Sequence, residues 1–375
     1  MPKSLHIALI RQRYVADGGA EGFVTRALAL LRNKNNAQIT LVTRAWDGSA
    51  QSIRVCNPFY LGSLWRDWSF ARAACRAVQD QDMDLVQAHE RVACCDIYRA
   101  GDGVHREWLR QRRRTLGAFG KLRLNINPYH YYVKAAETAV FESPRLRAVI
   151  CNSRMVKAEI KQYFHVRDDK LHVIYNGVDT IRFNPSLMHY RAEIRQRYKI
   201  PSHATLFLFV GSGFERKGVA VLLEALALLP DTAYLLLVGR DKKLEKFRAS
   251  AIRLGIDQRV IFAGIQKETT PFYGAADAFV LPTLYDPFPN VAFEAMASGL
   301  PIITSLKCGA AELIKNGENG YSCDALDKDQ LASYMDKLLA IEHRKALGMA
   351  ARHTVSLMDL NSMSQKLLAL YESLL

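Results

Sequence analysis

The sequence predicts an α/β fold made of two domains, each with a doubly wound parallel β-sheet. The chain has 375 residues, more than the roughly 100–200 residues of a usual single domain. Short apolar runs alternate with longer amphipathic stretches, which is the pattern of βαβ units. These runs form two series, separated by residues 176–200 with Gly177, Pro185 and a charged helix-like run at 190–198. We therefore expect an N-terminal domain at residues 1–178 and a second domain at residues 179–354.

The expected strands follow the apolar runs in chain order. The first series is 6–10, 37–42, 85–88 and 148–151, and the second is 206–210, 234–238, 260–262, 278–281 and 301–304. Residues 220–229, rich in Leu and Ala and without a helix breaker, form the clearest expected helix. Ligands of open α/β sheets bind beyond the carboxyl ends of the strands, so the loops that follow strands are the expected place for a site.

Composition is that of a globular chain with a basic surface. Hydrophobic residues make up 49% and charged residues 23%, which is unlike a disordered chain. No apolar run approaches the roughly 20 residues that cross a bilayer, and Arg11 and Arg13 follow the first apolar run too closely for a signal peptide. The net charge of +14 favours nucleic acid, anionic lipid or phosphorylated substrates as partners.

The cysteines are scattered along the chain and form no C-x-x-C pair. This pattern argues against a disulfide framework and against a zinc site. We expect buried free thiols in a reducing cytosol at all seven positions, namely Cys56, Cys75, Cys94, Cys95, Cys151, Cys308 and Cys323.

One glycine loop follows the first strand of each series. Gly18 and Gly19 lie between a strand and a helix, where backbone N–H groups can approach an anion. The pattern is not G-x-G-x-x-G, which disfavours a nicotinamide or flavin site, and an ordinary glycine turn fits equally well.

The second glycine loop, residues 211–218, contains Gly213, Arg216 and Lys217. An arginine fork beside a lysine suits a diphosphate. The pattern G-x-x-x-x-G-K-[ST] fails because Gly218 and Val219 follow Lys217, which disfavours a P-loop nucleotidase or kinase. A solvated charge pair at a helix start is the alternative.

A third stretch, residues 285–301, follows the expected strand 278–281 and carries Asp286 and Glu294 eight positions apart. Prolines fix the loop between them, and Asn290 is positioned to cap a helix in which Glu294 would lie near the first turn. Carboxylates accept hydrogen bonds from vicinal hydroxyls, as sugars and ribose offer. Two unrelated acidic residues around a cap are the alternative.

Together with residues 173–179 and 182–185, these three stretches resemble the retaining glycosyltransferases of family GT4, which have the GT-B fold of two Rossmann-like domains around a cleft. Within that family, residues 96–102, 210–219 and 238–243 are similar to the lipopolysaccharide core glucosyltransferases that add the first hexose to the inner-core heptose. The resemblance implies that residues 355–375 form a helix returning to the N-terminal domain.

The resemblance also implies a role for each residue. Arg216 and Lys217 would hold the diphosphate and stabilise the leaving nucleotide, while Asp102 would steer or deprotonate the acceptor hydroxyl. Asp102 fits an exposed turn equally well, and the nearby His89 and His105 receive no role. The donor would contact Gly18, Gly19, Gly213, Arg216, Lys217, Asp286, Asn290, Val291 and Glu294.

In this assignment Asp286 binds donor-sugar hydroxyls and Glu294 the ribose. The family has Glu at the first position, so the shorter Asp286 leaves the donor sugar open. The resemblance implies a retaining transfer from a nucleotide-diphosphate sugar, with UDP-glucose or a similar UDP-hexose as the first choice. It implies neither a cofactor nor a metal ion.

Residues 106–134 mix cations with aromatic and aliphatic side chains, a composition that suits the surface of an anionic membrane. Gly117, Gly120 and Pro128 interrupt any long helix, so a mobile loop or two short helices is expected. The residues assigned to the membrane or to a lipid-linked glycan acceptor are Arg110, Arg112, Arg113, Arg114, Lys121 and Arg123.

The sequence therefore favours a peripheral enzyme on the cytosolic face of the inner membrane. A solvated charged face is the simpler interpretation of residues 106–134, and nucleic acid is disfavoured because no reader motif is present. The rival functions are a catalytically inactive GT-B scaffold that binds nucleotide or glycan, and a basic nucleic-acid-binding α/β protein.

Overall fold

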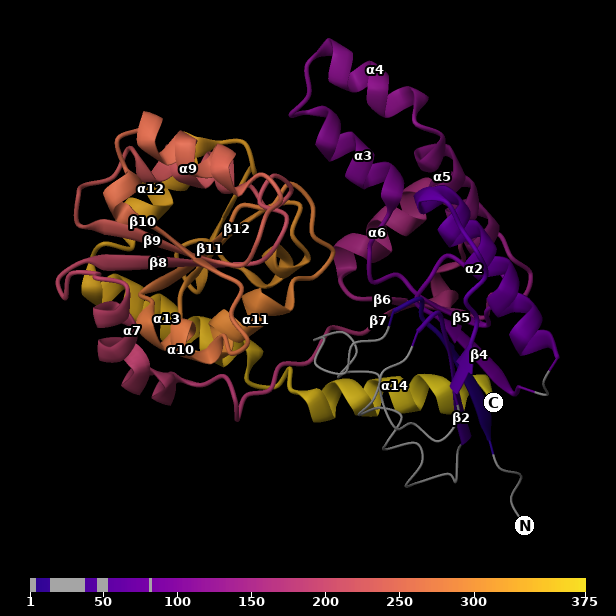
Figure 1. Ribbon diagram of the computed structural model, residues 1–375. Helices are drawn as coiled ribbons and strands as arrows, with labels where there is room; N and C mark the ends of the chain where they lie inside the picture. Colours follow the sequence, from indigo (N-terminus) through magenta and orange to yellow (C-terminus); the bar gives the residue numbers. More distant parts are fainter. Residues whose placement is uncertain (1–4, 14–37, 46–52, 81–82) are drawn as a thin grey trace. The chain divides into compact units, whose positions relative to one another are not determined.

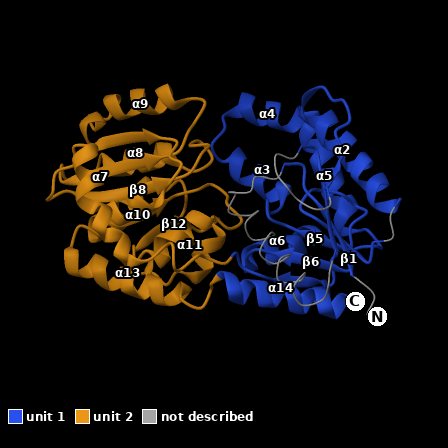
Figure 2. Ribbon diagram, turned by 60° about the horizontal axis from the view of Figure 1, so that its bottom comes forward, with its two compact units in different colours: residues 1–176, 360–375 blue, residues 177–359 orange. Residues whose placement is uncertain are grey.

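The computed structural model describes residues 5–13, 38–45, 53–80 and 83–375. The chain divides into two compact units (Figure 2). Unit 1 contains residues Met1–Asn176 together with Leu360–Leu375, and unit 2 contains Gly177–Asp359.

The described part of unit 1 holds a seven-stranded parallel sheet in the order β3-β2-β1-β4-β5-β6-β7 (Figure 1). Its strands are β1 (His6–Ile10), β2 (Gln38–Thr43), β3 (Ile53–Val55), β4 (Leu85–Ala88), β5 (Ile97–Arg99), β6 (Ala148–Cys151) and β7 (Leu171–Val173). Its described helices are α2 (Gly62–Gln79), α3 (His105–Arg113), α4 (Ala118–Ile126), α5 (Pro128–Phe141), α6 (Arg154–Tyr163) and α14 (Leu360–Leu374), with a 3-10 turn at Asp168–Lys170.

Alternate residues of β1, β2, β4, β5 and β6 pack into two different cores, because successive side chains of a strand point to opposite faces. Ala8 and Ile10 of β1 pack with residues of α2, α5 and α6. Ile7 and Leu9 pack on the opposite face, where α14 contributes Met363, Leu367 and Tyr371. Residues from the far end of the sequence thus complete the core of unit 1.

Unit 2 holds a six-stranded parallel sheet in the order β10-β9-β8-β11-β12-β13. Its strands are β8 (Thr205–Val210), β9 (Ala233–Val238), β10 (Val260–Gly264), β11 (Ala278–Leu281), β12 (Ile302–Ser305) and β13 (Gly320–Cys323). Its helices are α7 (Arg191–Arg197), α8 (Val219–Leu226), α9 (Leu244–Arg253), α10 (Thr270–Ala275), α11 (Asn290–Ala297), α12 (Lys328–Lys337) and α13 (Ile341–Val355), with 3-10 turns at Pro185–Tyr190, Asp257–Arg259 and Gly309–Leu313. Figure 1 shows α9 and α12 on one face of this sheet and α10, α11 and α13 on the other.

Both sheets reverse their strand order at one point. In unit 1 the chain proceeds outward from β1 to β3 and then returns to place β4 beside β1, and unit 2 repeats this between β8 and β11. The crevice at the carboxyl ends of the two strands flanking such a point is where doubly wound sheets bind ligands. The loops after β8 and β11 are therefore the first place to look for a site in unit 2.

The predicted fold class is confirmed, with local differences. Four short strands, β3, β5, β7 and β13, were not expected, because runs of three or four residues carry little periodicity. The expected helix 220–229 is α8, which ends at Leu226. It ends early because Pro230 disfavours helical backbone at the residue before it, and Leu228 and Leu229 close the segment with tight turns.

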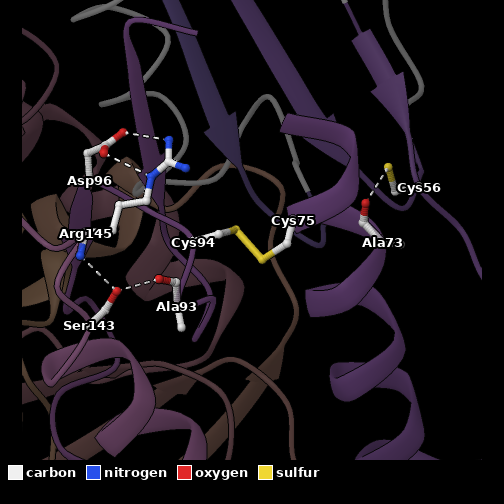
Figure 3. Close-up of a disulfide and its surroundings, with 8 residues drawn as sticks. All are labelled: Cys56, Ala73, Cys75, Ala93, Cys94, Asp96, Ser143 and Arg145. Carbon is white, nitrogen blue, oxygen red and sulfur yellow. Dashed lines mark hydrogen bonds and ion pairs between the residues drawn. A yellow bond between two sulfur atoms is a disulfide. The ribbon is translucent and has the colours of Figure 1, made fainter. Parts of the chain in front are cut away.

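One prediction about the cysteines is wrong. Cys75 of α2 and Cys94 in the loop after β4 form a disulfide with their Cα atoms 5.7 Å apart (Figure 3). The remaining five cysteines are free thiols, four of them buried. The sequence did not reveal the pair, because its members are 19 residues apart and meet only through the packing of α2 beside the β4–β5 loop.

Candidate active site

The loop after β8 is held close to the loop after β11. Gly218, the N-cap of α8, has a φ of 79°, and a Cβ there would lie 1.9 Å from the carbonyl oxygen of Pro282. The backbone N–H of Leu284 donates to the carbonyl of Arg216 at 2.9 Å, and the hydroxyl of Thr283 donates to the same oxygen at 3.2 Å. Only glycine permits this approach at position 218, and the approach sets where Arg216 and its neighbour Lys217 lie.

The other side of the same loop is bonded to the turn after β9. Gly213 N–H donates to the Arg240 carbonyl at 3.1 Å, and Phe214 N–H donates to Asp241 Oδ2 at 2.6 Å. A Cβ at Gly239 would lie 1.9 Å from the carbonyl oxygen of Gly211. Loop 211–218 is therefore braced from both neighbouring loops at the carboxyl end of the sheet.

Two cations converge on one carboxylate in this place. The ammonium of Lys217 contacts Asp286 Oδ2, and both side chains are about nine-tenths buried. Arg216 Nη1 lies 3.4 Å from the same oxygen and donates to the Tyr285 carbonyl at 3.0 Å, with its side chain 40% exposed. The group carries one excess positive charge on the side where Arg216 reaches solvent, which suits an anionic ligand.

Asp286 is held by its backbone as well as by its side chain. Its N–H donates to the Lys307 carbonyl at 3.0 Å, and its own carbonyl accepts from Gly309 N–H at 2.8 Å. Both partners belong to the segment that follows β12. The loops after β8, β11 and β12 thus meet at Asp286.

Glu294 lies in the second turn of α11 and belongs to a different hydrogen-bonded group. The hydroxyl of Tyr273 in α10 donates to Glu294 Oε2 at 2.7 Å. Burial raises the pKa of Glu294, while the Tyr273 hydrogen bond and the charge of Arg182 oppose this shift. Arg182 itself donates to both carboxylate oxygens of Glu268, at 2.9 and 3.0 Å.

The start of α11 differs from the expectation in one detail. Pro289 is the N-cap and Asn290 is the first helical residue, so the predicted capping role of Asn290 is wrong. The rigid Pro289 already has the extended backbone that a cap requires, which moves the helix start by one residue. Asn290 and Val291 form the first turn of α11.

The predicted donor residues therefore fall into two described groups. Gly213, Arg216, Lys217 and Asp286 are connected by the loops just described, and Glu294 lies with Tyr273 at α11. Gly18 and Gly19 lie outside the described residues. Across the described ranges, no group of three or more His, Cys, Asp or Glu side chains is arranged to hold a metal ion.

In unit 1, Asp102 follows β5 and its side chain is 71% exposed. Its Oδ2 lies 3.7 Å from Nη1 of Arg91, and Nε of Arg91 donates to Glu137 Oε1 at 3.2 Å. The same oxygen of Glu137 accepts the backbone N–H of His105 at 2.8 Å. A buried carboxylate on α5 therefore fixes both the cation beside Asp102 and the backbone three residues after it.

Arg91 and Glu137 were not recognised in the sequence. Arg91 follows β4 at the switch point, and that position was a usable signal. Glu137 lies within α5 and only the fold brings it to the turn after β5. The two histidines of this region stay neutral, because burial lowers the pKa of His105 to about 3 and places that of His89 well below its usual value.

The basic stretch 106–134 forms two nine-residue helices, α3 and α4, and the first turns of α5. Leu124 is the buried residue of α4, while Phe119, Leu122 and Ile126 are exposed at 77%, 57% and 66%. Their spacing of three and four residues places these three on one side of the helix. Of the assigned cations, Arg112 is half-buried and five are exposed, namely Arg110, Arg113, Arg114, Lys121 and Arg123.

Comparison with known families agrees with this architecture. The model of glycosyltransferase family 4 matches residues 17–182, and the model of glycosyl transferases group 1 matches residues 190–354. Lipopolysaccharide glucosyltransferase WaaG of Escherichia coli (strain K12) is 28% identical over 296 residues, which is 77% of each chain. The lipopolysaccharide core biosynthesis glycosyltransferase LpsE of Rhizobium meliloti (strain 1021) is 34% identical over 146 residues, 39% of this chain and 43% of that protein.

Solved structures show the same fold. The crystal structure of WaaG superposes with a TM-score of 0.82 at 24% identity, covering 97% of this chain and 99% of the other. Anabaena HepE, solved with UDP-glucose, superposes with a TM-score of 0.76 at 20% identity, covering 98% and 100%. The two sheets with their matching switch points, the glycine loops and the family matches to both halves lead to one conclusion: the chain is a glycosyltransferase of family 4 with the GT-B fold.

Proposed function

We propose that this glycosyltransferase moves a hexosyl group from a nucleotide-diphosphate sugar, UDP-glucose or a similar UDP-hexose, to a lipopolysaccharide-core or other surface-glycan acceptor. The observation that carries the proposal is the convergence of Arg216 and Lys217 on Asp286 beside the switch point of unit 2. The similar WaaG is a lipopolysaccharide glucosyltransferase, and the similar HepE was solved with UDP-glucose.

In the proposed donor complex, the diphosphate lies against loop 211–218 with Arg216 and Lys217 as its counter-charges. Asp286 accepts from hydroxyls of the donor sugar, and Glu294 accepts from the ribose. Gly213 allows close backbone approach, and Asn290 and Val291 present N–H groups at the start of α11. The proposal also assigns Gly18 and Gly19 to the donor, and both lie outside the described residues.

The proposed reaction retains the configuration of the anomeric carbon. The bond from that carbon to the diphosphate oxygen breaks, and negative charge develops on the leaving nucleotide while the sugar gains oxocarbenium character. Arg216 and Lys217 stabilise that charge from fixed positions. The leaving phosphate takes the proton of the acceptor hydroxyl, whose oxygen attacks on the same face. Asp102 orients that hydroxyl, and Arg91 holds Asp102.

The proposed acceptor is lipid-linked, and the exposed surface of α3 and α4 is the proposed contact with an anionic membrane on its cytosolic side. Along the described residues, the helices are all too short or too polar to cross a bilayer. Each cation near an anionic surface contributes about 1 kcal/mol. Replacing Arg112, Arg113 and Arg114 by Gln should therefore weaken binding to anionic vesicles by on the order of 100-fold. Unchanged vesicle binding would remove the membrane part of the proposal.

The decisive experiment is ligand-induced thermal stabilisation by UDP, GDP, CMP and ADP and their sugar conjugates. A ligand at about 100 times its Kd stabilises by roughly 2.7 kcal/mol. A response to one nucleotide identifies the base. The Arg216→Ala/Lys217→Ala variant should lose this response and transfer activity, whereas Lys242→Ala/Lys243→Ala, on the exposed neighbouring turn, should keep both.

Two outcomes would favour the rival functions. Normal nucleotide binding without turnover in the presence of glycan acceptors would indicate an inactive scaffold. No thermal stabilisation by any nucleotide, together with salt-dependent retention on nucleic acid, would indicate a nucleic-acid-binding protein.

A further inference from the structure

The start of α2 exposes a group of large apolar side chains that the proposed reaction does not use. Leu61, Leu64, Trp65 and Trp68 follow the i, i+3, i+4, i+7 spacing of one helix face, and Phe59 lies in the loop just before. The five side chains, here the aromatic face of α2, are between 37% and 73% exposed. Contiguous exposed apolar groups of this kind mark interaction surfaces rather than ordinary solvent-facing helix.

A buried arginine, Arg44, fixes the backbone that carries the aromatic face. Arg44 donates from Nη1 to Asn57 Oδ1 at 3.0 Å and to the Pro58 carbonyl at 3.1 Å, and from Nη2 to Ser69 Oγ at 3.0 Å. Its guanidinium also lies 4.7 Å from the centre of the Tyr60 ring. The loop before α2 is thereby attached to the second turn of the helix, which fixes the backbone on both sides of Phe59 and Trp65.

The rings on this face are arranged against each other and against a cation. Phe59 and Trp65 meet edge to face, with their centroids 5.6 Å apart. The guanidinium of Arg72 lies 5.1 Å from the centre of the Trp68 ring. Tryptophan beside arginine is the combination that collects at the boundary between lipid headgroups and acyl chains.

The helix that carries the aromatic face is also bonded to the segment that directly follows α4. Helix α4 ends at the exposed Ile126, and two residues later α5 begins. The hydroxyl of Tyr129, in the first turn of α5, donates to Asp67 Oδ2 at 2.9 Å, and Asp67 stands between Arg66 and Trp68 in α2. This hydrogen bond ties the first half of α2 to the start of α5, which follows α4 in the chain by two residues.

We propose that the aromatic face of α2 inserts into the interfacial region of an anionic lipid bilayer. The cations of α3 and α4 supply the electrostatic attraction, and Phe59, Leu61, Leu64, Trp65 and Trp68 supply the apolar contact. A cationic surface with a rigid group of aromatic side chains beside it binds such a membrane by both routes at once. This inference rests on the membrane contact in the proposed function and assigns it a second contact site.

The test uses the full chain and the tryptophans as depth probes. Replacing Trp46 and Trp108 by Phe leaves Trp65 and Trp68 as the only tryptophans. Vesicles of phosphatidylglycerol and phosphatidylethanolamine with brominated acyl chains should quench the emission of this protein and shift it to shorter wavelength. Bound protein whose tryptophans are not quenched would overturn the inference while leaving the membrane contact of α3 and α4 intact.

A variant pair measures the contribution of the face to binding. Leu61→Ser/Leu64→Ser should weaken partitioning onto these vesicles by at least about tenfold, because two apolar side chains no longer leave water. The matched control Ile252→Ser/Met349→Ser removes two apolar side chains that are 66% and 69% exposed elsewhere, and it should bind like the wild type. Equal binding by both variants would overturn the inference.

Three further outcomes separate the inference from its rivals. If the wild type binds no vesicle at all, the inference and the membrane contact of α3 and α4 both fail. If a soluble core oligosaccharide quenches Trp65 and Trp68 and vesicles do not, the face binds glycan and the inference is overturned. A dimer in sedimentation velocity that Leu61→Ser/Leu64→Ser dissociates would likewise overturn it in favour of self-association.

Discussion

Lys217 and Asp286 form an ion pair that is almost entirely withdrawn from water. Replacing Asp286 by Asn leaves a buried ammonium with no full counter-charge, so we expect the unfolding free energy to fall by about 3 kcal/mol. Chemical denaturation of the ligand-free protein measures this change. The control is Glu215→Gln, which breaks an ion pair to Lys243 with both side chains more than half exposed. That change should cost less than about 1 kcal/mol, and equal losses in the two variants would contradict the prediction.

The contribution of Glu294 to the free energy of unfolding should decrease as the pH rises. Burial raises its pKa, so above the usual glutamate value of about 4.3 the folded chain holds this proton more firmly than the unfolded chain. Glu294→Gln removes the buried charge and keeps an acceptor for Tyr273. We expect its thermal midpoint at pH 7 to equal or exceed that of the wild type, with the difference vanishing at lower pH, while nucleotide binding weakens about tenfold.

The matched control for this pH dependence is Glu268→Gln. Although burial raises the pKa of Glu268, hydrogen bonds from Arg182 and Thr270 outweigh it and lower the pKa. Its stabilising contribution is therefore present at neutral pH and disappears as the pH falls through the lowered pKa, the opposite sign to Glu294. Parallel pH profiles for the two variants would show that the assigned environments are wrong.

Glu137 should influence turnover without touching the donor. Its Oε1 accepts from Arg91 and from the backbone of His105, which precede and follow Asp102 in the sequence. Glu137→Gln weakens the hold on Arg91, so we expect kcat to fall by about tenfold, while the affinity for nucleotide is unchanged. Glu142→Gln, on an exposed residue at the end of the same helix, serves as the control. A change in nucleotide affinity alone would contradict a positioning role for Glu137.

The disulfide predicts the number of thiols that can be titrated. Protein denatured without a reductant should give five titratable thiols, because Cys75 and Cys94 form a disulfide. The same protein after reduction should titrate seven. The variant Cys75→Ser/Cys94→Ser should give five under both conditions, and seven thiols in unreduced wild type would show that the pair is open.

Part of the site could be predicted because its signals are local. Arg216 and Lys217 share one short loop with three glycines, and the loop follows an apolar run directly. Asp286 likewise lies in the loop directly after β11, and parallel strands end at one edge of a sheet. Local spacing was therefore enough to single out these two loops, and the resemblance to the family assigned them to one donor site.

The remaining contacts of the site could not be predicted, because they join elements that are far apart in the sequence. Tyr273 lies in α10 and reaches Glu294 in α11, and Glu137 lies in α5 and reaches the turn after β5. No residue pattern near these positions distinguishes them from ordinary helix residues. The same holds for the three-residue strands β5 and β7, which exist only through pairing with their neighbours, β5 with β4 and β6 and β7 with β6.

Because α14 packs against β1 and β4, the two units of this protein cannot complete their folding in the order in which they are synthesised. Residues 177–359 leave the ribosome as a continuous block and can fold on their own core while the polypeptide is still growing. Most of unit 1 is made earlier, yet Ile7 and Leu9 of β1 gain their contacts with Met363, Leu367 and Tyr371 only when α14 emerges. A nascent chain stopped before residue 360 would lack these contacts, and its apolar strand residues would be available to chaperones.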